Sequence, residues 1–224
     1  MINYTLIRSK RKTIGISIRD GLVTVRAPLK CPESEIDRIV LSKSKWITDK
    51  LTKSIEQLSY QKAFTLNYGD FVVLRGDRYP IIAREGTHAG FNGEYFYFPP
   101  NLCEKQIKDA CIKIYRKLAK VHFNERIALF AAQMNVSPSS VKVNSAKARW
   151  GSCSSKKSIN FSWRLIMSDD DVIDYVVVHE LAHLIQMNHS RKFWAIVEGV
   201  LPNYRERKGK LLELQKRLSE ENWG

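Results

Sequence analysis

The chain of 224 residues is 44% hydrophobic and 27% charged, a composition typical of a folded globular protein, which excludes a largely disordered one. It lacks an apolar run of about eighteen residues, which excludes a membrane-spanning helix, and its N-terminal segment lacks the apolar core of a signal peptide, so we expect a cytoplasmic protein. The net charge of +14 favours an anionic partner such as nucleic acid, a nucleotide or an acidic protein segment, although a solvated basic surface explains it equally well.

The first hundred residues have the pattern of a β-rich module that is interrupted by one helix. Apolar and polar residues alternate on both sides of Asp20-Gly21, which predicts a hairpin within a small antiparallel sheet over residues 3–27. Apolar residues at helical spacing predict one long amphipathic helix over residues 33–59. Strand patterns then return in three short segments, at residues 71–75, 78–83 and 94–98. We therefore predict an N-terminal module of residues 1–100, which ends at Pro99-Pro100.

The second half of the chain combines helical patterns with short strands. Helices are predicted over residues 102–135 and from Arg205 to about Glu220. Between them, strands are predicted at residues 140–144 and 158–165, on either side of a basic loop centred on Trp150-Gly151. Ser168 is then predicted to open a buried helix, with Asp171 completing a capping box. The predicted fold class is α+β, with a compact helical catalytic domain and a small sheet in residues 101–224.

The buried helix carries the pattern H-E-x-x-H, formed by His179, Glu180 and His183. Residues four apart in an α-helix lie about 40° apart around its axis, so both imidazoles project from one face and can share one zinc ion. Glu180 directly follows His179, so its carboxylate can reach a water molecule on the metal without being a ligand, as a general base does. A packed core histidine is the ordinary alternative, but unpaired ionisable groups in an apolar helix are costly, and this cost favours a metal.

Catalytic zinc usually has three protein ligands, so one ligand lies outside the motif. We expect the helix to end at Met187 or Asn188 and Ser190 to cap a new helix, which places His189 in the turn between them. His189 is therefore the preferred third ligand. Glu198, one to two turns into the next helix, is the competitor.

The chain resembles the YgjP-like predicted metal-dependent hydrolases, relatives of the SprT-like and other small zincin proteases. The residues that carry the resemblance are K-A-R-W-G-S-C-S, S-I-N-F-S-W-R-L, Y-V-V-V-H-E-L-A-H, M-N-H-S-R-K-F-W and P-N-Y-R-E-R, in this order. The resemblance covers essentially the whole chain and is most specific from Lys147 to Arg207. It implies a zincin-like (minigluzincin-type) catalytic domain in which one zinc ion is held by His179, His183 and His189, with Glu180 as the base.

The resemblance is more decisive about the metal than about the reaction. A metallopeptidase is the preferred function. In that reaction zinc polarises the scissile carbonyl, and the peptide pairs with the free edge of the strand at residues 159–165. A hydrogen-bonding or positively charged side chain stabilises the oxyanion, and the candidates are Tyr204, Arg205 and Arg207.

Two alternatives start from the basic charge of the chain. One is a metal-dependent nucleoside triphosphate pyrophosphatase or other phosphoanhydride hydrolase, in which the basic loop holds phosphates through Lys147, Arg149, Lys156 and Lys157. Sites that hydrolyse phosphates are usually richer in carboxylate ligands and often hold two metals, so this function ranks second. The other is a nucleic-acid-associated protein with a zinc site, whose binding would depend strongly on salt.

Overall fold

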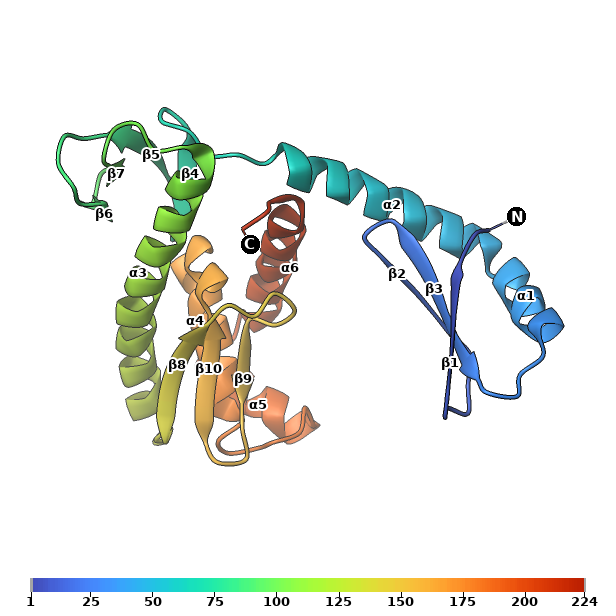
Figure 1. Cartoon of the computed structure of the whole chain (residues 1–224). Helices are drawn as coiled ribbons and strands as arrows, with labels where there is room; N and C mark the ends of the chain where they lie inside the picture. Colours follow the sequence, from blue (N-terminus) through green and yellow to red (C-terminus); the bar gives the residue numbers. More distant parts are fainter. Residues whose placement is uncertain (1, 224) are drawn as a thin grey trace. The chain divides into compact units, whose positions relative to one another are not determined.

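The computed structural model describes residues 2–223, and over these residues the chain is an α+β protein with six α-helices, one 3-10 helix and three small sheets (Figure 1). Met1 and Gly224, the outer ends of the two predicted domains, lie outside the described residues. The chain divides into two compact units. The first runs to Phe64 and includes Leu218–Asn222, and the second comprises Thr65–Arg217 and Trp223.

The sheet of the first unit contains β1 (Thr5–Ser9), β2 (Gly15–Arg19) and β3 (Leu22–Pro28) in the order β1-β3-β2. Strands β2 and β3 form the predicted antiparallel hairpin, whose turn residues Asp20 and Gly21 both have positive φ, at 51° and 70°. The prediction of a wholly antiparallel sheet was wrong, because β3 lies between the other two strands and pairs with β1 in parallel. Side chains alternate between the two faces with the same period in parallel and in antiparallel strands, so the sequence pattern does not distinguish parallel from antiparallel pairing.

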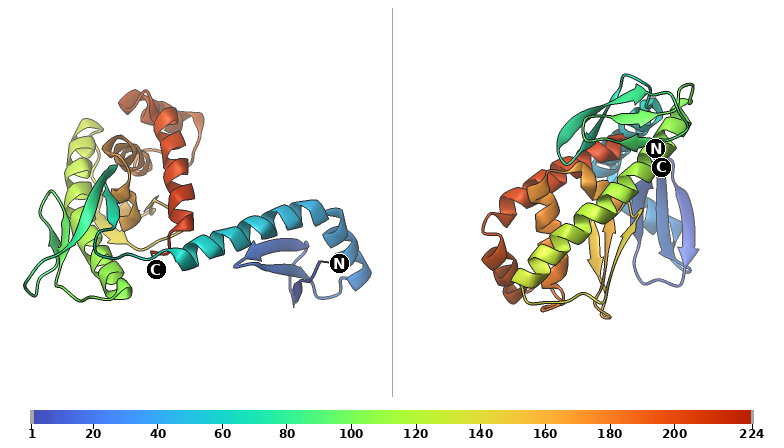
Figure 2. Two further views of the ribbon diagram at one scale, coloured as in Figure 1. Left: turned by 90° about the horizontal axis from the view of Figure 1, so that it is seen from above. Right: turned by 90° about the vertical axis from the view of Figure 1, so that its left-hand side faces the viewer.

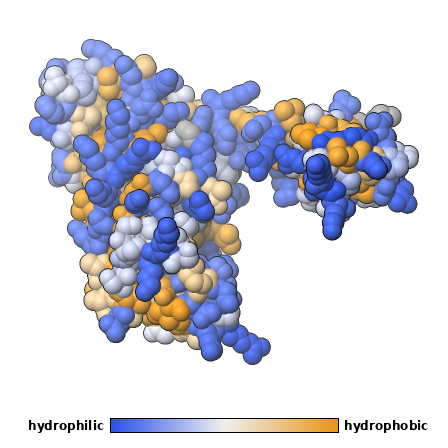
Figure 3. Space-filling view, turned by 60° about the horizontal axis from the view of Figure 1, so that its bottom comes forward, coloured by the Kyte–Doolittle hydropathy of each residue, from blue (hydrophilic) through white to orange (hydrophobic). Residues whose placement is uncertain are grey.

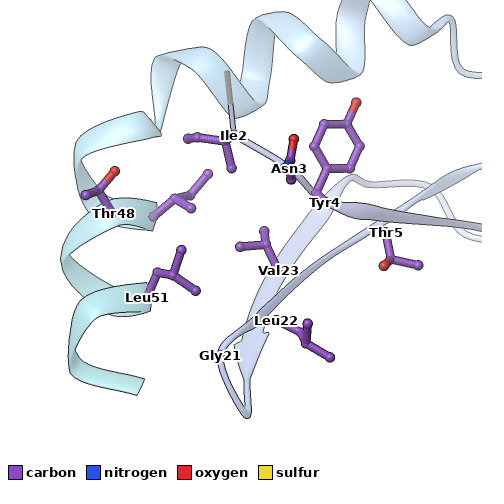
Figure 4. A pocket seen from close by; sticks show the side chains of 10 residues that line it. Ile2, Asn3, Tyr4, Thr5, Gly21, Leu22, Val23, Thr48 and Leu51 are labelled. Carbon is purple, nitrogen blue, oxygen red and sulfur yellow. The ribbon is translucent and has the colours of Figure 1, made fainter. Parts of the chain in front are cut away.

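Two helices cover this sheet where one long helix was predicted. They are α1 (Glu33–Ser42) and α2 (Ser44–Ala63), and the helix breaks at Lys43, which has φ −107° and ψ 13°. The break lets apolar side chains of both helices reach one core, formed by Val23, Val25, Ala27, Ile36, Val40 and Ile47. Figure 4 shows a pocket of about 490 Å³ in this unit, where Ile2, Val23 and Leu51 line the space between the strands and α2. No His, Cys or acidic residue lines this pocket.

In the second unit, a four-stranded sheet packs on one long helix. The strands are β4 (Phe71–Leu74), β5 (Asp77–Ala83), β6 (Gly90–Phe91) and β7 (Phe96–Phe98), in the order β4-β5-β7-β6, and the helix is α3 (Glu104–Gln133). The Tyr115 hydroxyl of α3 donates a hydrogen bond of 2.7 Å to the Val73 carbonyl, and the Tyr115 ring lies 5.4 Å from that of Phe96. These contacts join the sheet to α3, so the structural division falls after Phe64, whereas the sequence-based boundary was placed at Pro99-Pro100.

The rest of the second unit surrounds a buried helix. A three-stranded sheet has the order β8-β10-β9, from β8 (Ser140–Asn144), β9 (Gly151–Cys153) and β10 (Ser158–Ser162). The helices that follow are the 3-10 helix η1 (Trp163–Met167), α4 (Asp170–Ala182), α5 (Arg191–Val200) and α6 (Tyr204–Glu220). Helix α3 runs beside this sheet, as Figures 1 and 2 show from three sides.

Four details of this region differ from the sequence-based predictions. The strand predicted to reach residue 165 ends at Ser162, and the 3-10 helix η1 follows it. All five residues of η1 are buried, whereas a strand with one exposed face would leave alternate residues exposed. Helix α4 begins after Asp169, without the predicted capping box of Ser168 and Asp171, and it ends at Ala182 instead of near Asn188. Strand β10 lies between β8 and β9, so it has no free edge, and the edges of this sheet are β8 and β9.

The face drawn in Figure 3 is largely hydrophilic, with hydrophobic patches on both units. Among the described residues, no helix combines the length and apolar character that crossing a bilayer requires.

Candidate metal centre

Helix α4 positions the candidate site, and its first half is held by carboxylates that pair with cations from three other elements. These pairs are Arg75 Nε to Asp170 at 2.7 Å, Lys210 Nζ to Asp171 at 2.8 Å and Arg126 Nε to Asp174 at 2.6 Å. The next residues, from Tyr175 to Val178, are all buried. The fixed and buried helix carries His179 and Glu180 into the interior of the unit.

The three histidines converge at the end of this helix. His179 lies in the last turn of α4, His183 is its C-cap residue, and His189 lies in the turn just before α5. One ring nitrogen from each histidine lies within 4.8 Å of the other two, and the Nε2 atoms of His179 and His189 are 3.0 Å apart. The structure therefore brings together the three residues that were predicted as ligands.

The spacing of this cluster is compatible with a zinc site, and His179 has the protonation state that metal binding needs. Zinc–nitrogen bonds of about 2.0–2.1 Å in a tetrahedral site separate the ligand nitrogens by about 3.4 Å, a value that the observed distances bracket. Burial, helped by the neighbouring His183 and His189 and by Lys208, lowers the pKa of His179 to about 3, so its imidazole is neutral at pH 7. His183 Nδ1 lies 3.3 Å from the Gln186 carbonyl oxygen, which leaves Nε2 of that ring for the cluster. Neutral imidazoles are the form that binds metal ions.

Phe193 supports all three imidazoles. Its ring is fully buried, and its centroid lies 4.9 Å from that of His179, 4.6 Å from that of His183 and 4.7 Å from that of His189. The neighbouring Trp194 ring lies 5.8 Å from both His179 and His189. The sequence analysis assigned no role in the site to these two aromatic residues. Their positions, four and five residues after His189, were the available signal.

Glu180 lies beside the histidine cluster in a buried position. The residue is only 5% exposed. Its Oε2 atom is buried and has no hydrogen-bond partner among the described residues. Burial raises the pKa of Glu180 to about 8, and the charge of Arg149 acts against this rise. A Cβ atom placed on Gly151, the first residue of β9, would lie 2.5 Å from Glu180 Oε1. The carboxylate therefore lies directly against the edge strand, a contact that the sequence did not reveal.

The other predicted site residues lie farther from the histidines. The buried Tyr204 ring stacks on Trp194 at 5.3 Å, so Trp194 stands between it and His189. Arg207 Nη1 donates a hydrogen bond of 3.3 Å to the Asp171 carbonyl, eight residues before His179 and hence about 12 Å along the helix axis. Arg207 is thus not brought together with the histidines.

The competitor for the third ligand position does not join the cluster either. Glu198 is exposed on α5 and pairs with Arg205 at 3.3 Å. Among the described residues, the histidine trio is the group whose geometry suits a metal ion. Of the four basic residues of the predicted phosphate-binding loop, Arg149 is the one whose charge acts on Glu180.

Comparisons with known proteins place the chain in a family. No curated protein matches it. Two solved metallopeptidase zymogens show a partial likeness, Pyrococcus abyssi abylysin with 21% identity and Methanocaldococcus jannaschii jannalysin with 20%. The first alignment covers 41% of this chain and 92% of the other with a TM-score of 0.38, and the second covers 43% and 96% with 0.37. At these TM-scores the likeness supports no conclusion about function. A family model described as the YgjP-like metallopeptidase domain matches residues 12–213, most of the chain, and the protein therefore belongs to the YgjP-like metallopeptidase family.

Proposed function

We propose that this protein is a zinc-dependent metallopeptidase that hydrolyses peptide bonds with Glu180 as the general base. The observation that carries the proposal is the meeting of three imidazole nitrogens within 4.8 Å of one another beside a buried carboxylate. Its family membership supports a metal-dependent hydrolase acting on a peptide or protein. All residues proposed for the reaction belong to the second unit.

His179, His183 and His189 would hold one zinc ion through their ring nitrogens. When bound, zinc polarises a carbonyl group and lowers the pKa of water, which is the chemistry that peptide hydrolysis needs. The three rings are kept in place by Phe193, whose buried ring contacts each of them. Packing against this one buried ring thus gives the three proposed ligands a common support.

Glu180 moves the proton in the proposed reaction. Its carboxylate takes a proton from the attacking water and later gives it to the leaving amine nitrogen. Burial raises the pKa of Glu180 in the metal-free chain, and the positive charge of a bound zinc ion would lower it again and so favour the carboxylate form that a base needs. Gly151 limits the space on one side of this carboxylate and so keeps it directed at the site.

The free edge of β9 is the proposed binding place for the peptide backbone. Strand β9 pairs with β10 on one side only, so its other edge presents unpaired backbone groups, and its first residue touches Glu180. Tyr204 stays as the proposed oxyanion partner, although it is separated from His189 by Trp194. Arg207 is the weaker candidate, because its guanidinium donates to the Asp171 carbonyl instead. An extended peptide along β9 would bring its scissile bond to the histidines.

A paired substrate screen tests the proposal. Zinc-loaded protein is incubated with a peptide library, and in parallel with a panel of nucleoside triphosphates. We expect new peptide termini in the mass spectrum, which disappear for Glu180→Gln. Release of phosphate or pyrophosphate without peptide cleavage would instead support the phosphoanhydride hydrolase, which the positive charge of Arg149 beside Glu180 favours.

A further inference from the structure

Two cations from different elements flank the candidate metal centre. Lys208 of α6 lies with its ammonium group 5.5 Å above the Trp194 ring, and that ring is 5.8 Å from both His179 and His189. Arg149 lies two residues before Gly151, which contacts the Glu180 carboxylate. The charge of Lys208 acts on His179 and the charge of Arg149 acts on Glu180. The site thus has one positive charge near His179 and another near Glu180.

Neither of these two cations forms an ion pair with an acidic side chain of the described residues. The carboxylates at the start of α4 are paired with Arg75, Lys210 and Arg126, and Glu198 of α5 is paired with Arg205. Within the part of the chain that the structure describes, neither Arg149 nor Lys208 has a carboxylate within ion-pair distance. Both residues are exposed, so their charges remain available to a ligand.

The surroundings of the cations fit a peptide better than a nucleotide. The turn between His183 and His189 exposes two apolar side chains, Ile185 at 52% and Met187 at 53%. The free edge of β9 offers backbone hydrogen-bonding groups that suit an extended chain. A nucleotide would use neither of these features, whereas a peptide with mixed apolar and acidic side chains would use both.

We propose that this site selects peptide segments with an Asp or Glu side chain next to the scissile bond, and that Lys208 and Arg149 determine this preference. The inference rests on the proposed peptidase function. An acidic side chain of the substrate would take the place of the carboxylate partner that each cation lacks. Because both cations are exposed, the attraction weakens as salt shortens the screening length from about 10 Å at 0.1 M.

The test measures binding and cleavage separately on the full-length, zinc-loaded protein. Binding uses the Glu180→Gln variant and two fluorescein-labelled ten-residue peptides, which are identical except that every Glu of the first is Gln in the second. We expect the acidic peptide to bind about tenfold more tightly at low salt, and the difference to vanish in the added double change Lys208→Glu with Arg149→Glu. The milder single changes Lys208→Gln and Arg149→Gln should each remove part of the difference in affinity between the two peptides.

A matched control separates local charge from the general basicity of the chain. Lys105→Glu together with Lys113→Glu makes the same total charge change at two exposed positions of α3, and it should leave the preference intact. Equal binding of the two peptides would overturn the inference, as would an equal loss in this control double variant. Displacement and hydrolysis of a nucleoside triphosphate in preference to the peptide would also overturn it. If the acidic peptide binds selectively but the wild-type protein cleaves neither peptide, the charge preference stands and the peptidase function fails.

Discussion

The Glu180 carboxylate lies against Gly151 so closely that a Cβ atom on this glycine would come within 2.5 Å of Oε1 and 2.6 Å of Cγ. The contact joins the last full turn of α4 to the first residue of an edge strand. It means that the conformation of the proposed base depends on a residue 29 positions earlier in the chain, which has no side chain of its own.

Gly151→Ala should therefore displace the Glu180 carboxylate. We expect turnover to fall by about 100-fold, because a displacement of about 1 Å in a catalytic group has an effect of that size. The zinc content, measured by atomic emission, should stay at one ion per chain. The matched control is Gly209→Ala in α6, where an added Cβ meets nothing within 4 Å, and which should stabilise the helix by about 1 kcal/mol with unchanged turnover.

Glu180→Gln should keep the metal and lose turnover. The amide keeps the shape of the side chain but cannot accept the proton from water, so we expect a loss of about 10²- to 10⁴-fold in kcat. Zinc content and kcat are measured on the same preparation. A variant that lost its zinc would show that Glu180 is a ligand, and the proposed role as base would fail.

His189→Ala should weaken zinc binding strongly, whereas Glu198→Ala should leave it unchanged. The reason is that His189 Nε2 lies 3.0 Å from His179 Nε2, while Glu198 pairs with Arg205 away from the cluster. Competition with a chromogenic chelator gives the zinc affinity of both variants. The reverse order of the two effects would assign the third ligand to Glu198.

Tyr204→Phe tests the hydroxyl of Tyr204 without removing its ring. Because the ring stacks on Trp194 and Tyr175, the phenylalanine ring should preserve the packing and the thermal stability. If the hydroxyl stabilises the oxyanion, kcat should fall by about 100-fold while KM changes little. An unchanged kcat would leave Tyr204 with a packing role, and the same assay on Arg207→Gln tests the second predicted oxyanion partner.

The metal-free Glu180→Gln variant should lose stability as the pH falls below about 6.5. Burial lowers the pKa of His122, His179 and His183 in the folded chain. The unfolded chain therefore takes up protons in this range that the folded chain resists, and unfolding is favoured until the pH reaches the folded-state pKa values. The raised pKa of Glu180 has the opposite effect in the same pH range, because the folded chain then binds a proton that the unfolded chain does not, and Glu180→Gln removes this contribution. Urea unfolding of the Glu180→Gln variant at pH 7.5 and 5.5 measures the effect of the histidines, and the added change His122→Gln, outside the metal site, should reduce it. A stability of this variant that rose on acidification would contradict the burial of these rings.

Local patterns predicted much of the fold. The alternation around Asp20-Gly21 predicted the β2–β3 hairpin, and helical spacing over residues 102–135 predicted α3, which spans Glu104–Gln133. The spacing of His179 and His183, with His189 a few residues later, also predicted that three imidazoles would meet. These features depend on residues that are close together in the sequence, so a periodic pattern of residue types is enough to predict them.

The features that were missed depend on contacts between distant residues. The parallel pairing of β1 with β3 follows from which strand lies in the middle of the sheet, and no pattern within β1 encodes that position. The early end of α4 at Ala182 follows from His183 turning toward the Gln186 carbonyl. The contact of Gly151 with Glu180 and the placement of Lys208 over Trp194 likewise require the assembled unit.

The ion pairs of α4 all belong to its first five residues, Asp170–Asp174, whereas the imidazoles lie at its opposite end. The N-terminal end of the helix is thus fixed by ion pairs, whereas its C-terminal end is held mainly by packing against Phe193. Zinc binding would therefore order only the C-terminal end of the helix. The metal-free protein would keep its fold, while the residues around the three histidines would be more mobile.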